Sequence, residues 1–266
     1  MLFRSPNMRQ DETPAKQKQP ILRAPASVLV LIGLIVIIQA LMATGGPSTT
    51  TSFLVEMALF PARFFAEGLG GLPGGLGQGI ATLFTYSLLH GSWAHCLINV
   101  AFLLAFGAPV AKRLGARRFI YLYVLCVMLA GYGQVWMTSF DGYLIPIIGA
   151  SGGVAGMVGA AARFAFSQGV WGVSNEHQRL LSLRQVVTHR TVMMFILVWL
   201  GMNLIFGLLG PLGMATPDGS PTNIAWVAHV VGFFSGLLLM GLFDKPPLSA
   251  SGGPGNVDFG DWKDPK

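Results

Sequence analysis

Six long apolar stretches constrain this chain more than any other feature of its sequence. They cover about residues 26–43, 93–111, 119–139, 146–166, 191–212 and 224–243. A helix that crosses a bilayer needs roughly 20 consecutive, mostly apolar residues, and each stretch is close to that length. The sequence therefore predicts an all-α integral membrane protein built as a bundle of six transmembrane helices.

Composition supports the same class. Only 11% of the 266 residues are charged, 53% are hydrophobic, and the mean hydropathy is +0.61, which the surface of a soluble globular protein could not tolerate. The first stretch follows basic residues, as a signal peptide does, but no convincing small-x-small cleavage site follows its apolar core of residues 28–42. We expect an uncleaved first helix. Cys96 and Cys126 both lie inside predicted spans, so we expect no disulfide.

The basic residues are distributed unevenly between the two ends of the predicted helices. Of the 17 Lys and Arg residues, 16 lie in the two tails and in the second-to-third and fourth-to-fifth connections, and only Arg63 lies on the other side. Basic residues are enriched in cytoplasmic connections. Both termini are therefore predicted to be cytoplasmic, and the net charge of +6 reflects membrane topology and gives no reason to expect nucleic-acid binding.

The chain divides into a membrane domain, residues 24–243, and two polar tails, residues 1–23 and 244–266, of which the second is expected to be disordered. A long outer connection, about 44–92, joins the first two spans. The apolar run 53–60 in this connection indicates a segment that lies on the membrane surface. The glycine-rich run from Gly68 to Gly79 is interpreted as a flexible linker, with a hinge as the alternative.

Three polar residues are predicted to lie at one depth in the bilayer. With the N-terminus inside, helices two, four and six all run inward from the outer face, so the residues near their starts share a level. These residues are His95, Ser151 and His229. No Asp, Glu, Lys or Arg interrupts the hydrophobic cores, and ionisable residues inside spans are expensive and usually functional.

A serine and a histidine at one depth provide the minimum for acyl transfer. A serine hydroxyl is a weak nucleophile until a hydrogen-bonded imidazole takes its proton, so Ser151 is the candidate nucleophile and His229 the candidate base. Without an intramembrane carboxylate, the pair is predicted to act as a dyad. His95 and Asn99, at i and i+4 on one helix face, and Gly149 are assigned to an oxyanion site. The backbone N–H of Ser151, near a helix start, would add a donor.

Each residue also has an ordinary structural interpretation. Ser151 could hydrogen-bond to its own helix, and His229 could bond across helices. His95 and Asn99 could join helices as uncharged polar contacts do in membranes. The small residues of the fourth and sixth helices indicate packing surfaces, and close packing there would bring Ser151 and His229 together.

Three motifs in this order resemble the rhomboid intramembrane serine proteases, across nearly the whole core. The motifs are His90-Gly91-Ser92-Trp93-Ala94-His95-Cys96-Leu97-Ile98-Asn99, Gly149-Ala150-Ser151-Gly152, and Ala228-His229-Val230-Val231-Gly232-Phe233-Phe234-Ser235-Gly236. The resemblance implies a six-helix rhomboid-like bundle in which Ser151 is the nucleophile, His229 the general base, and His95 and Asn99 oxyanion donors. It also implies a water-filled cavity open to the outside, whose approach His90 and Ser92 are expected to line.

The chain departs from the family pattern at three positions. Arg63 stands alone where members often carry a Trp-Arg pair, and Ile224 replaces a glycine five residues before His229. Ala155 stands four residues after Ser151, where some members carry an aromatic residue that packs on the base. We therefore expect another group to hold His229 in place.

Other intramembrane chemistries fit the sequence less well. The His-Glu-x-x-His motif of metalloproteases is absent from the sequence, and Asp141 and Asp218 fall in outer loops, where an aspartyl protease could not use them. No metal, nucleotide or other cofactor motif is present. Two alternatives to a protease are a rhomboid-like protein that binds transmembrane segments without cutting them and a transporter that uses His95 and His229 as proton carriers.

The expected partners are the lipid bilayer and single-span membrane proteins, whose helix is cut near its outer end. The short polar N-terminus and the six-helix core are most similar to a bacterial plasma-membrane member. The tail at residues 10–19 does not have the Arg- and Ser-rich amphipathic character of a mitochondrial presequence.

Overall fold

The computed structural model of the protein describes residues 24–65, 74–138, 144–166, 179–213 and 225–244. In these ranges the regular elements are helices, and one isolated antiparallel bridge joins Leu59 to Ile147. The prediction of an all-α protein is confirmed. The two polar tails lie outside the described residues, apart from Asp244 at the start of the second.

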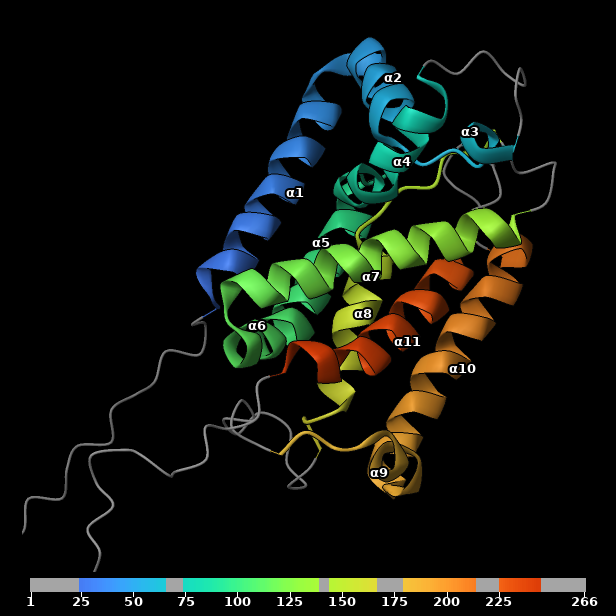
Figure 1. Ribbon diagram of the computed structural model, residues 1–266. Coiled ribbons are helices and arrows are strands. Elements are labelled where there is room, and N and C mark those ends of the chain that lie inside the picture. The colour runs from blue at the N-terminus through green and yellow to red at the C-terminus, as the bar shows by residue number, and fades with distance from the viewer. Residues whose placement is uncertain (1–23, 66–73, 139–143, 167–178, 214–224, 245–266) are drawn as a thin grey trace, which may run out of the picture.

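Six apolar helical segments correspond to the six predicted stretches (Figure 1). Among the described residues, four are long and apolar enough to cross a membrane: α1 (Ala26–Thr44), the continuous run Trp93–Leu114, α7 (Ala116–Met137) and α11 (Trp226–Phe243). Two other apolar helical segments are shorter: α8 (Ser151–Ala162) and the part Arg190–Ile205 of α10 (Arg190–Gly213). The chain is therefore a multi-helix membrane bundle.

The second span contains a widened turn. It comprises α5 (Trp93–Phe102), the π-helical segment η2 (Leu103–Gly107) and α6 (Ala108–Leu114). Pro109 lies two residues after the end of the π turn. A proline cannot donate to the carbonyl four residues earlier and clashes with it in a regular helix. A π turn in this position relieves that clash while the span continues.

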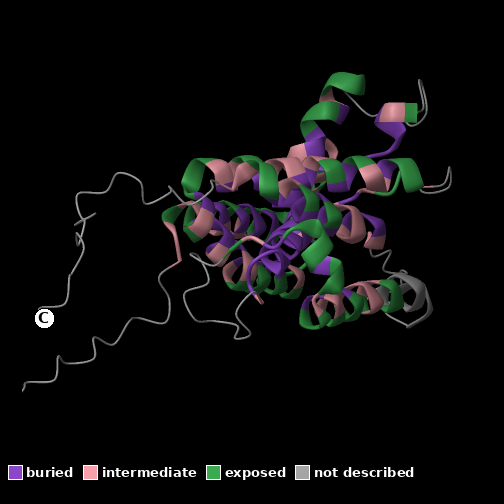
Figure 2. Ribbon diagram, turned by 60° about the horizontal axis from the view of Figure 1, so that its bottom comes forward, coloured by how far each residue is buried: buried purple, intermediate pink, exposed green. Residues whose placement is uncertain are grey.

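Helix α8 lies at the centre of the bundle, beside α7 and α11 (Figure 1). All its residues from Gly152 to Ala162 are buried, in the buried centre visible in Figure 2. The sequence of α8 contains only Gly, Ala, Val and Met after Ser151. Such small side chains allow neighbouring backbones to approach closely, as is typical of packed membrane helices.

The closest approach is between α8 and α11. A Cβ added to Gly232 of α11 would overlap the carbonyl oxygen of Gly152, and one added to Gly236 would overlap that of Gly156. The two pairs lie one helical turn apart. The glycines therefore form a continuous backbone contact that sets the spacing of α8 and α11.

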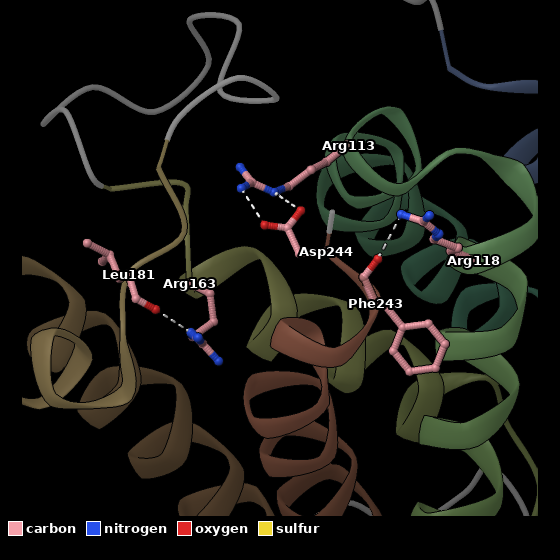
Figure 3. Close-up of polar contacts among 6 residues, drawn as sticks. All are labelled: Arg113, Arg118, Arg163, Leu181, Phe243 and Asp244. Carbon is pink, nitrogen blue, oxygen red and sulfur yellow. Dashed lines mark hydrogen bonds and ion pairs between the residues drawn. The ribbon is translucent and has the colours of Figure 1, made fainter. Parts of the chain in front are cut away.

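Arginines from other helices bind the C-terminal end of α11 (Figure 3). Arg113 of α6 makes a two-pronged ion pair with Asp244, with Nε 2.9 Å from Oδ1 and Nη2 2.8 Å from Oδ2. Arg118 of α7 donates to the carbonyl oxygen of Phe243 at 3.2 Å. Cations at this position also complement the negative end of the helix dipole.

Arg163, which follows α8, makes a third connection to α11 and also contacts Leu181, as Figure 3 shows for the second contact. Its Nη1 donates to the carbonyl oxygen of Leu237 at 2.8 Å and its Nε to that of Leu181 at 2.7 Å. Leu181 precedes α9 (Leu183–Thr188), a short helix whose start is closed by a capping box. The C-terminal end of α11 is thus attached to α6, α7 and the segments that flank α8 and α9.

The connection between the first two spans is helical over most of its described length. It contains α2 (Gly46–Met57), α3 (Ala62–Phe65), α4 (Gly75–Thr85) and the 3-10 turn η1 (Tyr86–Leu88). The prediction of a linker from Gly68 to Gly79 is wrong for its final residues, because Gly75 to Gly79 belong to α4. Apolar residues after these glycines complete the amphipathic pattern of α4. The end of the glycine-rich run is therefore the beginning of this helix.

Arg63 organises the turn between α2 and α3. Its guanidinium donates to the carbonyl oxygens of Ala58, at 3.0 Å, and Val55, and lies 5.3 Å from the ring centroid of Phe60. These carbonyls lie at the C-terminal end of α2, where backbone acceptors lack helical partners. The Arg63 side chain therefore adds to the backbone hydrogen bonds of this turn, which run from the N–H of Arg63 to Phe60 and from the N–H of Phe64 to Pro61. Burial lowers the pKa of Arg63, against the opposing effect of Glu56.

Candidate active site

Ser151 and His229 lie in direct contact. The hydroxyl oxygen of Ser151, the first residue of α8, is 2.7 Å from Nε2 of His229, in the first turns of α11. Both side chains are half-buried. The glycine contact between α8 and α11 explains this distance, since it removes the side chains that would otherwise hold the two helix starts apart.

The start of α11 is also tied to α7. The side-chain oxygen Oε1 of Gln134 accepts a hydrogen bond from the backbone N–H of Ala228 at 3.1 Å. Ala228 belongs to the first turn of α11, where backbone donors have no partner in their own helix. Gln134 therefore fixes the turn that carries His229.

The segment that leads into Ser151 is held by hydrogen bonds on each side. The backbone of Ile147 pairs with that of Leu59, and the N–H of Gly149 donates to the carbonyl oxygen of Tyr86 at 3.0 Å. The N–H of Ala150 then donates to Nε2 of His90 at 3.3 Å. Ser151 is thus presented by a fixed backbone.

Gly149 separates the ring of His95 from the hydroxyl of Ser151. Its φ of +120° is rarely adopted by residues with a side chain. A Cβ at Gly149 would lie 2.9 Å from Cε1 and 3.0 Å from Nε2 of His95, and 3.7 Å from Oγ of Ser151. The absence of a side chain here leaves the space that His95 and Ser151 both face.

Asn99 is buried one turn below His95 on α5. One hydrogen of its amide nitrogen Nδ2 is donated to the carbonyl oxygen of His95 in the same helix at 3.0 Å, so this hydrogen bond does not join two helices. A side-chain amide has two donor hydrogens. The second has no partner among the described hydrogen bonds.

His90 does not line an open approach to the site, and this expectation is wrong. The residue is 1% exposed, its Nε2 accepts the N–H of Ala150, and its ring lies edge-on to that of His95 at 4.9 Å. It supports the backbone beside Ser151. Ser92 is exposed and caps α5 by accepting the N–H of His95 at 3.2 Å.

Asn203 of α10 contacts the other nitrogen of the His229 ring and was missed by the sequence analysis. Its Oδ1 is 2.8 Å from Nδ1 of His229, and its Nδ2 donates to the carbonyl oxygen of Trp199 at 2.8 Å. An uncharged amide within the predicted span 191–212 could have drawn attention to it. The same applies to Gln134 in the span 119–139.

The segment that carries this site is similar in sequence to known proteins. A family model of the rhomboid domain matches residues 77–245, which include every candidate site residue. The chain is 30% identical over 156 residues to the Rhomboid protease GlpG of Pectobacterium atrosepticum, covering 59% of this chain and 46% of that protein. It is 29% identical, with the same coverage, to the Rhomboid protease GlpG of an Enterobacter species. The chain spans about half the length of the curated relatives it matches. The matched domain covers more than half of the sequence, and the chain belongs to the rhomboid family.

Proposed function

We propose that this chain is an intramembrane serine endopeptidase that uses Ser151 as nucleophile and His229 as general base. The observation that carries the proposal is the 2.7 Å contact between Oγ of Ser151 and Nε2 of His229 at the starts of two apolar helices. As Oγ attacks a peptide carbonyl carbon, its proton passes to Nε2. The imidazolium then returns a proton to the leaving amine, and water repeats the sequence to release the acyl group.

Negative charge that develops on the attacked carbonyl oxygen needs donors fixed in advance. His95 is the candidate side-chain donor because its Nε2 and Oγ of Ser151 both face the space beside Gly149. The remaining N–H of Asn99 and the backbone N–H of Ser151, at the start of α8, complete the proposed oxyanion site. Gly149 contributes by leaving this space open.

The proposed substrates are single-span membrane proteins, cut near the outer end of their transmembrane helix. A peptide carbonyl inside a regular helix is hydrogen-bonded and shielded, so the segment must unwind to reach Ser151. Substrates whose helix is locally unstable there are therefore favoured.

The proposed topology places both termini in the cytoplasm, because 16 of the 17 Lys and Arg residues lie in the tails and connections on one side. Residues 24–243 form the membrane domain, and residues 1–23 and 244–266 form cytoplasmic tails. The relatives named above come from bacteria, which supports a bacterial inner membrane as the location. Under this topology the site opens toward the outer face.

The test is cleavage of a model single-span substrate by purified protein in liposomes, together with labelling by a serine-directed fluorophosphonate. Wild type should cut and label, whereas Ser151→Ala should do neither and His229→Ala should lose nearly all of both. Cleavage that persists in Ser151→Ala would contradict the proposal. A wild type that neither cuts nor labels would favour a rhomboid-like protein that binds transmembrane segments without cutting them.

A further inference from the structure

We infer that Asn203 is a positioning residue that holds the His229 ring in the tautomer and orientation needed by Ser151; the inference rests on the function proposed above. No carboxylate is in contact with His229 among the described hydrogen bonds, and Ala155 cannot pack on the ring as an aromatic residue would. Asn203, from α10, bonds the ring on the side opposite Ser151.

The hydrogen bonds determine which way the Asn203 amide points. The carbonyl oxygen of Trp199 can only accept, so the group that faces it at 2.8 Å must be the amide nitrogen Nδ2. The oxygen Oδ1 is then directed at His229. The orientation follows from a backbone acceptor one turn earlier in the same helix, and no second orientation satisfies both contacts.

The amide orientation in turn determines the protonation of the imidazole. Oδ1 of Asn203 can only accept, so Nδ1 of His229, 2.8 Å away, carries the hydrogen. In a neutral imidazole the other nitrogen then has the free lone pair. That nitrogen, Nε2, is the atom 2.7 Å from Oγ of Ser151, and it can therefore accept the serine proton. The hydrogen on Nδ1 stays in its bond to Asn203 while Nε2 gains and loses the proton.

A second contact keeps Asn203 in register with His229. The rings of Trp199 and Phe233 stack with centroids 6.2 Å apart and an interplanar angle of 22°. Trp199 lies one turn before Asn203 on α10, and Phe233 one turn after His229 on α11. Ala155 belongs to the same apolar cluster as Phe233 and Trp199. Ala155 is too small to pack on the ring of His229. Helix α10 instead supplies the packing, through Trp199, and the acceptor, Oδ1 of Asn203, that hold the base.

Three variants separate a positioning role from a structural one. Asn203→Leu keeps the approximate size of the side chain and removes the acceptor. Asn203→Asp keeps an acceptor oxygen, whether or not the carboxyl is ionised. Met202→Leu is the matched control, because Met202 is the preceding residue of α10 and its side chain is 50% exposed.

The experiment measures kcat and KM for the model substrate, the rate of fluorophosphonate labelling, and the midpoint of thermal unfolding. Asn203→Leu should lower kcat and the labelling rate by about 10- to 100-fold, because part of the rate contribution of the general base is lost. KM should stay within about twofold of the wild-type value. Asn203→Asp should recover most of this loss, and Met202→Leu should match wild type. The inference is overturned if Asn203→Leu retains the wild-type kcat, or if both Asn203 variants lose activity equally.

A measurement that does not depend on cleavage distinguishes this inference from the proposed function. In protein with 15N-labelled histidine, the ring nitrogens of His229 should report a protonated Nδ1 in wild type and in Ser151→Ala, and a mixture of tautomers in Asn203→Leu. The same spectrum in wild type and in Asn203→Leu would contradict the inference even if the enzyme were active. An inactive wild type with the expected spectra would contradict only the proposed function.

Discussion

Gly236 on α11 and Gly156 on α8 meet with no room for a side chain between them: a Cβ on Gly236 would overlap the carbonyl oxygen of Gly156. We expect Gly236→Ala to push the two helices apart, which should cost about 1 to 3 kcal/mol in the free energy of unfolding and lower kcat. Thermal unfolding in detergent would measure the first effect. Gly201→Ala is the control, because a Cβ there would meet nothing within 4 Å, and equal midpoints for the two variants would contradict the prediction.

Gly149 should not tolerate even one added methyl group. Gly149→Ala places a Cβ 2.9 Å from the His95 ring at a φ of +120°, so the ring must move or the backbone must change. We expect kcat to fall by about 100-fold, as it does when one oxyanion donor is lost. Gly91→Ala is the comparison, because its Cβ would meet only Ile148, at an ordinary 3.7 Å. Similar cleavage rates for both variants would show that the space beside Gly149 is not needed.

His95 and Asn99 should act on the rate of the chemical step more than on substrate binding. Replacing either residue by Ala should lower kcat by roughly 10²- to 10³-fold, while KM changes little, because the negative charge exists only in the transition state. Steady-state kinetics with the model substrate would test this. Ile98→Val, at a neighbouring exposed position of α5, should behave as wild type, and a large rise in KM with unchanged kcat would argue for a role in substrate binding.

The general architecture was accessible from the sequence because spans have a characteristic length and composition. The predicted spans and their directions also placed Ser151 and His229 near the starts of two helices that run the same way. Asn203 and Gln134 were not found, because their roles depend on rotation about the helix axis and on partners about 26 and 94 residues away. His90 was misjudged for a related reason: the sequence reveals a polar residue, but not that the N–H of Ala150 would occupy its ring nitrogen.

The ion pair between Arg113 and Asp244 should contribute measurably to stability, since the two side chains are only 7% and 11% exposed. Asp244→Asn removes the negative charge and should cost about 1.5 to 3 kcal/mol in the free energy of unfolding, the range for hydrogen bonds to charged groups. The unfolding midpoint in detergent measures it. Arg117→Gln changes an exposed arginine nearby and should shift the midpoint far less; equal shifts would indicate a general effect of charge.

Substrates should respond to changes in the stability of their own helix. If helix-breaking residues near a mapped cleavage site are replaced by Leu, a good helix former, cleavage should slow because unwinding becomes harder. The rate measured in liposomes for matched substrates tests this, with the same replacement made at the opposite end of the substrate helix as the control. An unchanged rate near the cleavage site would show that local unwinding does not limit the reaction.

Helix α11 is anchored at its C-terminal end by Arg113 and Arg118, at Leu237 by Arg163, and at the turn that carries His229 by Gln134, so it can transmit a tilt from its C-terminal anchors to the imidazole as a rigid rod does. From His229 to Phe243 the helix is about 21 Å long at 1.5 Å per residue, so a tilt of about 3° at the anchored end displaces the imidazole by about 1 Å. A displacement of that size can reduce a reaction rate 100-fold. Mutations at the arginine contacts can therefore change catalysis at a distance of four helical turns, without altering any group that touches the substrate.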